Sequence, residues 1–459
     1  MSTFFKTSTK SDQLHDFLKK EIQREAFKPT QRIPSERDLA ERFQLSRLTV
    51  HKVFSNLVTE GILYRKQGQG TFVSPKASKK QTLSICMLSP SLPTACMNVL
   101  FNQFENQYPH IVIKAHHFST SEIGNVQFWA RQPDFDLIMV GESVAPFMIQ
   151  QEFLEDLTDK INIDLPMENF HSTPVPVFTS AGRSYAVPFV SSPVVLLCNC
   201  RLFAEAGIPI ESGPMEWDDF LAKAKRLTVP EKGQYGFAFS NHRNRWPVLL
   251  MKRGACLFDE KGSFRFHDGP VRDAFQWFHD LVYRHHVAPS PLISISNLFA
   301  TGKAAMYMGT GYCMPGLNNK ESFEYAIIPL PGEISASSGL VSMAFGIHRD
   351  SPRKETAWDF IKLALSEKFQ SELYSAGYAL PRRKIERFDA NPKYQTLARE
   401  LVRGKPLGSN PDQFHALDFL TEHLKLFWSN MAPLGKTLDE AERQITENKE
   451  SPAQAMTPD

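Results

Sequence analysis

The sequence predicts a multidomain protein in which a short α+β unit precedes a long α/β body. Its 459 residues, at about 150 per domain, suggest roughly two to four domains. The first 80 residues hold 16 Lys and Arg against 8 Asp and Glu, a net charge of +8, whereas the rest carry −6 and all six tryptophans. With 42% hydrophobic and 22% charged residues, the composition disfavours disordered, collagenous and membrane-embedded classes. A basic unit on an acidic body indicates a polyanion-binding module joined to another domain.

Three helices and a hairpin are expected in the basic unit. Apolar residues at helical spacing predict a first helix from Ser11 to about Phe27. Ser35, followed three residues later by Asp38, has the form of a capping box and starts a short second helix. Ser46 caps a third helix, which ends at Glu60-Gly61. Strands at 62–66 and 71–73 flank a glycine-bearing turn, so the unit is a winged helix-turn-helix.

The motifs of this unit resemble those of the GntR family of bacterial regulators. The matching segments keep their order and spacing over about residues 10 to 74: Ile33–Ala40, Leu45–Val50, Leu57–Leu63 and Gly68–Val73. The resemblance implies that Arg37, Arg47 and Thr49 meet DNA and that Gly68 and Gly70 let the wing backbone enter the minor groove. We also expect Ser46, at the start of the third helix, to contact DNA.

The helix face that carries Arg47 also carries His51, because the two residues are four apart. Arginine at the start of a recognition helix can bind guanine bidentately. The alternative is that Arg37 and Arg47 only solvate the surface or pair with Glu36 and Glu41. The family usually has Arg or Lys at the position of His51, so this residue either makes a weaker, pH-sensitive DNA contact or none.

The body begins after a short polar linker at 77–81, which places the winged domain at 1–76 and the effector domain at 82–459. Apolar strands near residues 83–88, 111–115 and 135–140 alternate with helices, which predicts a parallel α/β sheet. Ligands of such sheets bind beyond the carboxyl ends of the strands, which draws attention to Glu142.

Collinear motifs over about residues 82 to 385 resemble the extracellular solute-binding proteins of sugar ABC importers. The matching segments are Phe104–Ile111, Asp134–Ile138, Gly182–Pro188, Leu202–Ile208, Glu216–Phe220, Phe299–Met306 and Ala357–Lys362. The resemblance implies a two-lobed α/β fold of the periplasmic-binding-protein type (type II). Lobe one would hold about 82–188 and 343–376, and lobe two about 193–340 and 380–450.

Sugar sites combine aromatic platforms with a few polar groups. Trp246 follows a polar segment, and Tyr312 follows a strand that ends in glycines, where importer relatives commonly place an aromatic against the sugar. Either ring could instead belong to the core. Trp129, Glu142 and Arg245 complete the expected ligand set, with Arg243 as a further polar candidate.

Enzymatic motifs such as GxSxG, HExxH and the P-loop are absent from the sequence, and no cofactor or metal is expected. His279, His285 and His286 lack a carboxylate at metal-ligand spacing. One alternative is a MocR-like regulator with an aminotransferase-like body, in which Lys354 would hold pyridoxal phosphate. A regulator that senses a non-sugar solute is a second possibility, and a constitutive architectural DNA-binding protein is a third.

The expected function is therefore a ligand-responsive transcriptional regulator. It would bind double-stranded operator DNA as a homodimer, sense a sugar or oligosaccharide by lobe closure, and repress carbohydrate uptake or utilisation genes. Six scattered cysteines without CxxC pairs, no visible signal peptide and no long apolar segment lead us to expect a cytoplasmic protein without a membrane span.

Overall fold

The computed structural model divides into two compact units, Met1–Ile85 with Met97–Ala115, and Cys86–Cys96 with His116–Asp459. The described residues are 10–23, 26–74, 81–88, 94–119, 123, 128–129, 134–171, 176–213, 215–259, 262–293, 295–313, 323–332, 338–375, 392–408 and 410–450. The linker expected at 77–81 lies mostly outside them, since the description resumes at Gln81.

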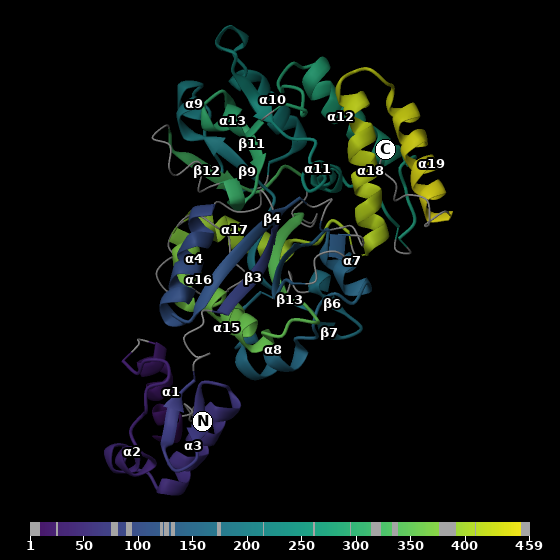
Figure 1. Ribbon diagram of the computed structural model, residues 1–459. Helices are drawn as coiled ribbons and strands as arrows, with labels where there is room; N and C mark the ends of the chain where they lie inside the picture. The colour runs from purple at the N-terminus through teal and green to yellow at the C-terminus, as the bar shows by residue number, and fades with distance from the viewer. Residues whose placement is uncertain are drawn as a thin grey trace. The chain divides into compact units, whose positions relative to one another are not determined.

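The N-terminal part of the chain folds as three helices and a hairpin (Figure 1). They are α1 (Lys10–Gln23), α2 (Glu36–Phe43), α3 (Arg47–Thr59), β1 (Leu63–Lys66) and β2 (Gly70–Val73). Apolar side chains from all five elements, such as Leu18, Leu39 and Phe54, form one buried core. Strands β1 and β2 pair antiparallel, with Tyr64 opposite Phe72. The predicted winged helix-turn-helix is confirmed.

Short polar residues start α2 and α3 as the sequence indicated. The Ser35 hydroxyl accepts from the Asp38 amide at 3.2 Å, and the Asp38 carboxylate accepts from the Ser35 amide at 3.1 Å. The Ser46 hydroxyl accepts from the Thr49 amide at 3.1 Å. These bonds satisfy amides that a helix N-terminus leaves unpaired, and they fix where α3 begins.

The sheet of lobe one has the strand order β4-β3-β5-β13-β8. Its strands are β3 (Gln81–Leu88), β4 (Ile111–Phe118), β5 (Leu137–Gly141), β8 (Ala186–Pro193) and β13 (Leu340–Ile347). Its helices are α4 (Thr94–Gln107), α7 (Ala145–Gln150), α8 (Thr158–Asp164), α15 (Lys354–Ala364) and α16 (Glu367–Ser375), with the short hairpin β6 (Thr179–Ser180) and β7 (Arg183–Ser184).

Lobe two contains the sheet β10-β11-β9-β12. Its strands are β9 (Val195–Asn199), β10 (Tyr235–Ala238), β11 (Ala304–Gly309) and β12 (Tyr325–Ile328). Its helices are α9 (Cys200–Glu205), α10 (Trp217–Leu227), α11 (Trp246–Lys252), α12 (Gly269–Tyr283) and α13 (Ile295–Ala300).

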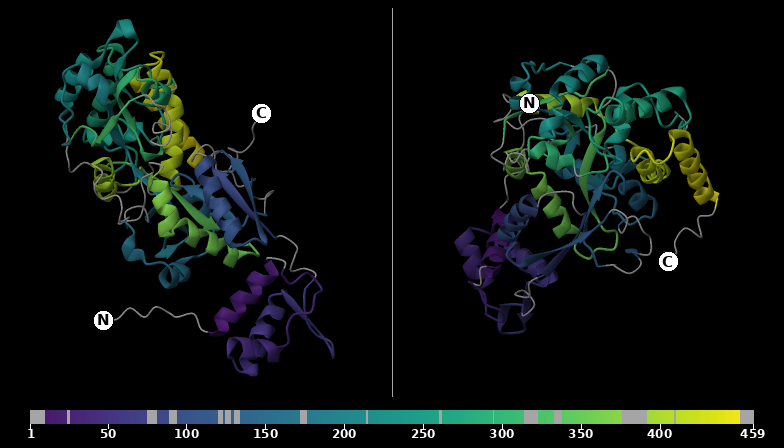
Figure 2. Two further views of the ribbon diagram at one scale, coloured as in Figure 1. Left: turned by 90° about the vertical axis from the view of Figure 1, so that its left-hand side faces the viewer. Right: turned by 90° about the horizontal axis from the view of Figure 1, so that it is seen from above.

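The described residues after 375 contain three helices: α17 (Pro392–Arg403), α18 (Pro411–Trp428) and α19 (Leu434–Glu450). Helix α17 contacts both β8 and β12. Helices α18 and α19, yellow in Figure 2, lie side by side, and their apolar residues share one core with α11, α12 and the lobe-two strands.

The expectation of a parallel sheet is wrong at the strands that link the lobes. Strand β13 is antiparallel to both β5 and β8, and β9 is antiparallel to both β11 and β12. Strand β8 continues almost directly into β9 at residues 193–195, so the chain crosses from one sheet to the other without a helix. Alternation of strands and helices predicted β3, β4 and β5, but not these crossings.

Candidate nucleic-acid interface and ligand site

The N-terminal end of α3 presents the residues expected at DNA. Arg47 is the first residue of the helix and is exposed, as is its neighbour Leu48. The hydroxyls of Ser46 and Thr49 lie 2.7 Å apart, so one donates to the other, and the O–H of the accepting hydroxyl is left to donate to a phosphate. This end of α3 therefore combines an exposed guanidinium with two fixed hydroxyls.

Arg37 and His51 both have carboxylate partners. The Arg37 Nε lies 3.3 Å from Glu41 Oε1, and this exposed pair is weak enough to exchange for a phosphate contact. The His51 Nδ1 lies 3.0 Å from Glu36 Oε1. Arg65, from the wing, contacts the same oxygen at 3.5 Å.

The wing turn depends on glycine at two positions. Gly68 has φ 73° and Gly70 φ 111°, in the region that L side chains rarely adopt. A Cβ on Gly70 would also lie 2.8 Å from the Arg32 Nε. Glycine thus allows both the turn and the close approach of Arg32, whereas the predicted minor-groove role of the wing stays a prediction.

A row of polar side chains crosses the lobe-one sheet where β5 ends. Glu142 follows Gly141, which pairs with Met343, and Ser342 pairs directly with Ser191 across β13 and β8. All three side chains are buried. Among the described residues, Glu142 Oε1, Ser191 Oγ and Ser342 Oγ have no hydrogen-bond partner. We call these three residues the junction row.

Burial raises the pKa of Glu142 to about 8, although the amide and hydroxyl of Ser342 oppose the rise. Ser342 thus acts on the Glu142 carboxyl, although Glu142 Oε1 and Ser342 Oγ themselves have no hydrogen-bond partner among the described residues. At neutral pH the carboxyl is therefore mostly protonated and can both donate and accept. The junction row then offers three uncharged polar groups.

Arg243 connects this region of lobe one to lobe two and to α18. Its Nη2 donates to Ser143 Oγ at 2.6 Å, and its Nη1 pairs with the carboxylate of Asp418. Burial raises the pKa of Asp418, and the charge of Arg243 opposes that rise. Burial and the charges of Arg245 and Arg243 lower the pKa of His242 to about 4, so this imidazole is neutral at pH 7.

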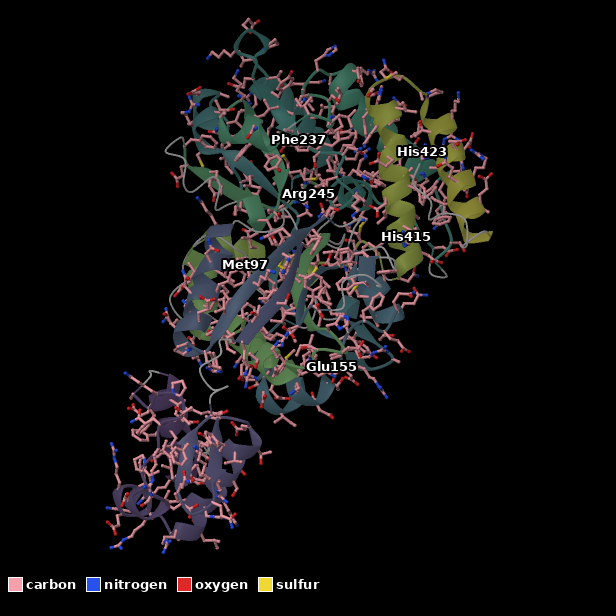
Figure 3. The ribbon with its side chains drawn as sticks, in the orientation of Figure 1. Met97, Glu155, Phe237, Arg245, His415 and His423 are labelled. Atoms are coloured by element: carbon pink, nitrogen blue, oxygen red, sulfur yellow. The ribbon has the colours of Figure 1, made fainter. Side chains whose placement is uncertain are left out.

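Arg245 and Tyr312 lie on the lobe-two side. Arg245 Nη2 donates to Thr310 Oγ1 at 3.2 Å, and Figure 3 shows Arg245 in lobe two, just below Phe237 of β10. The Tyr312 hydroxyl lies 3.3 Å from the Val190 carbonyl oxygen and 3.1 Å from that of Val341. These carbonyls directly precede Ser191 and Ser342, so Tyr312 lies beside the junction row.

The two tryptophans of the expected ligand set belong to cores. Trp246 is 1% exposed, packs against Phe275 and donates from Nε1 to Thr421 Oγ1 at 3.0 Å. Trp129 is 4% exposed and donates to the Ile123 carbonyl at 2.7 Å. Neither indole offers an open face in this structure, which corrects the expectation of stacking platforms. Helix α18 covers Trp246, and local polarity could not reveal that contact.

Sequence reasoning missed Ser191, Ser342 and Asp418. Ser191, with its neighbour Ser192, and Ser342 interrupt the apolar strands 186–193 and 340–347, and polar residues inside buried strands were a usable signal. Asp418 offered no signal, because its partner Arg243 is 175 residues away.

Metal-ligand clusters and membrane-spanning helices are both absent from the described ranges. Those ranges contain no group of three or more His, Cys, Asp or Glu placed to hold a metal ion. None of the described helices combines the length and apolarity needed to cross a membrane.

Sequence comparisons identify both parts of the chain. The profile of the bacterial regulatory proteins of the gntR family matches residues 10–73, and that of the bacterial extracellular solute-binding proteins matches residues 90–371. The chain is a gntR-family domain fused to a solute-binding-protein domain. Both families are binding or regulatory families by description, which supports a non-enzymatic protein only indirectly.

Curated relatives resemble this fusion in part of their length. The transcriptional repressor NagR of Bacillus subtilis is 48% identical over 71 residues, 16% of this chain and 29% of NagR. An uncharacterized lipoprotein of Streptomyces antibioticus is 29% identical over 225 residues, 44% of this chain and 48% of the lipoprotein. The chain thus spans less than half the length of these relatives.

Solved structures resemble the body of the fusion. A substrate-binding protein of Listeria monocytogenes, in complex with cycloalternan, has a TM-score of 0.72 at 18% identity and covers 81% of this chain and 99% of its own. A solute-binding protein of Thermotoga lettingae, bound with tagatose, has a TM-score of 0.73 at 17% identity, covering 80% and 99%. At these identities the likeness shows the fold alone.

The predicted two-lobed α/β body of the fusion is confirmed, and the aminotransferase-like alternative is wrong. A solute-binding match over residues 90–371 occupies the region that the aminotransferase-like body would need. Lys354, its proposed cofactor lysine, instead pairs with Glu155, whose Oε2 lies 2.8 Å from the lysine Nζ.

Proposed function

We propose that this protein is a ligand-responsive repressor in which the gntR-family domain binds operator DNA and the body binds a carbohydrate. The junction row carries the ligand half of the proposal, because orphaned buried polar atoms cost free energy unless a ligand or water satisfies them. Relatives named as repressors, including NagR and an arabinose metabolism repressor of Geobacillus stearothermophilus, support the DNA half.

A hydroxyl-rich, uncharged ligand suits the junction row best. Glu142, protonated at neutral pH, and two serine hydroxyls each donate and accept, as sugar hydroxyls do. Similar folds have been solved with tagatose, ribitol and mannitol, which supports this class. One similar protein is in complex with glycerophosphocholine, so a non-sugar solute is the second candidate.

In the proposed mechanism, ligand binding changes the closure of the lobes. Arg243 contacts lobe one through Ser143 and α18 through Asp418, so closure would move or break these contacts. A ligand can alter DNA affinity only if it binds the DNA-binding state and the non-binding state of the protein with unequal affinity. We further propose a homodimer on an inverted repeat, because one winged domain reads only a half-site, and a cytoplasmic location, where operator DNA is accessible.

The test screens the full-length protein against sugars, sugar alcohols, oligosaccharides and glycerophosphocholine. Tryptophan fluorescence reports the body alone, because no tryptophan precedes residue 80. A true ligand at 100 times its Kd should add about 2.7 kcal/mol of stability. The same compound should release a duplex operator obtained by in vitro selection.

Matched variants assign the site. Ser342→Ala should weaken binding of the compound, and Ser263→Ala, at an exposed serine of lobe two, should not. A response to glycerophosphocholine alone would move the proposal to a non-sugar solute. Operator binding with no response to any compound would instead favour a constitutive DNA-binding protein.

A further inference from the structure

One cluster in the DNA-binding domain joins the recognition helix to the wing. Glu36 comes from α2, His51 from α3 and Arg65 from β1. The Glu36 Oε1 lies 3.0 Å from His51 Nδ1 and 3.5 Å from Arg65 Nη2. Arg65 Nη2 also lies 3.4 Å from His51 Nδ1 and 3.2 Å from Ser55 Oγ. The carboxylate of Glu36, the imidazole of His51 and the guanidinium of Arg65 thus lie within 3.5 Å of one another.

The geometry decides which partner His51 uses. A carboxylate only accepts, so the 3.0 Å contact with Glu36 requires a proton on Nδ1. With that proton in place, Nδ1 cannot accept from Arg65, and the 3.4 Å approach between them brings two donors together. Arg65 is then held by Ser55 and by the longer contact with Glu36.

The cluster lies on the side of α3 that carries Arg47. Arg47, His51 and Ser55 are spaced by four residues and so share one helix face. About two fifths of the Arg65 side chain and nearly half of the His51 side chain are exposed. The titratable or charged groups that face His51 are Glu36 from α2, Arg47 on its own helix and Arg65 from β1.

We infer that Arg65 is a further phosphate-binding residue and that His51 positions it by competing for Glu36. This inference rests on the proposed DNA binding. With neutral His51, the charges of Glu36 and Arg65 cancel and the cluster is neutral. With the imidazolium, the Nδ1–H contact with Glu36 becomes an ion pair, the cluster gains one positive charge, and the charge of Arg65 is available to DNA. Histidine changes charge between pH 5 and 8, so operator affinity should rise as pH falls.

The test measures operator binding by the full-length protein at pH 6.0, 7.0 and 8.0 at fixed ionic strength. Wild type should bind about 5- to 10-fold more tightly at pH 6.0 than at pH 8.0, as expected for uptake of up to one proton. The slope of log K against log salt should steepen by about 0.9 at the lower pH, since one more charge meets a phosphate.

Variants separate the cluster from other titrating groups. His51→Gln should bind with the high-pH affinity throughout, and His51→Lys with the low-pH affinity. Arg65→Gln should lose both the salt increment and the pH response. His15→Gln is the matched control: His15 also pairs with a glutamate, Glu60 at 2.9 Å, in the same domain but away from the cluster, and this variant should keep the wild-type response.

Two results would overturn the inference. One is a wild-type affinity that does not rise from pH 8.0 to pH 6.0, and the other is an equal pH response in His51→Gln and wild type. Either leaves the proposed function standing, because operator binding at pH 7.0 is measured in the same titration. Absence of binding at every pH would instead contradict the DNA half of that function.

Discussion

Replacing Glu142 by glutamine should stabilise the body at neutral pH and flatten its pH dependence. The carboxyl titrates at about 8 in the folded protein, against an ordinary value of 4.5, because burial penalises its charged form. The folded state therefore holds its proton more tightly than the unfolded state. The resulting stability is fully present below pH 4.5 and is lost as pH rises to about 8.

The size of the effect follows from the shift. Each pH unit between the ordinary pKa of 4.5 and the folded-state pKa of about 8 lowers the free energy of unfolding by about 1.4 kcal/mol. The stability lost is therefore at most about 3 kcal/mol at pH 7 and about 5 kcal/mol above pH 8. Glutamine resembles the protonated carboxyl in shape and cannot ionise. The stability gained by Glu142→Gln should therefore be under about 1 kcal/mol at pH 5 and grow to about 3 kcal/mol at pH 7.

Urea unfolding monitored by tryptophan fluorescence, without ligand, at pH 5, 6, 7 and 8 measures this difference for the body. Glu231→Gln, at an exposed carboxylate of lobe two, is the matched control and should track wild type at every pH. The reasoning is refuted if the curves of Glu142→Gln and wild type stay parallel from pH 5 to pH 8.

Three further predictions concern the core, the recognition helix and the junction. Trp246→Ala should cost about 3 to 5 kcal/mol in urea unfolding, because it leaves a cavity and removes the hydrogen bond to Thr421, whereas Trp246→Phe should cost clearly less; a loss under 1 kcal/mol for alanine would contradict the core assignment. Arg47→Ala should weaken binding to the selected operator by about 1 to 3 kcal/mol at fixed salt, while Arg284→Ala, at an exposed arginine just after α12, should leave it unchanged; equal losses would indicate a general charge effect. Tyr312→Phe should cost about 1 kcal/mol of stability, because phenylalanine lacks the hydroxyl that contacts the carbonyls of Val190 and Val341, but it should keep ligand affinity if the ring stacks on the ligand. Tyr312→Ala should lose both stability and ligand affinity. Ligand affinity that survives Tyr312→Ala would remove Tyr312 from the site.

Features set by neighbouring residues could be predicted from the sequence. The capping box of Ser35 and Asp38 and the cap at Ser46 need only residues three apart, and both form as expected. The turn glycines of the wing are equally local, because a positive φ is a property of one residue. The fold of the body followed from the order of many weak motifs along the chain rather than from any one of them.

Features set by distant partners could not be predicted. Trp246 follows a polar segment and looked exposed, but its Nε1 donates a hydrogen bond to Thr421 of α18, which is 175 residues away in the sequence. Arg243 was a polar candidate for the ligand site, but nothing near it in the sequence indicated that it joins Ser143 to Asp418. In both places a residue's environment depends on which helix the fold lays over it, and periodicity along the chain does not encode that choice.

The junction row stands apart from the other orphaned polar groups. In the described residues, Asn199 Nδ2 and Gln370 Oε1 also lack partners, but the other polar atom of each of these side chains makes hydrogen bonds to the backbone. Asn199 Oδ1 caps α9 by accepting from the Leu202 amide, and Gln370 Nε2 donates to two backbone carbonyls.

No such contact accounts for Ser191 and Ser342, and alanine would fill both strand positions without leaving a hydroxyl unpaired. Together with Glu142 they place three unsatisfied buried polar groups, each of which costs folding free energy, where β8 leaves lobe one and β13 enters it. A solute that fills their hydrogen bonds would recover that cost beside the point where β8 passes directly into β9. Ligand binding there would act on lobe closure directly.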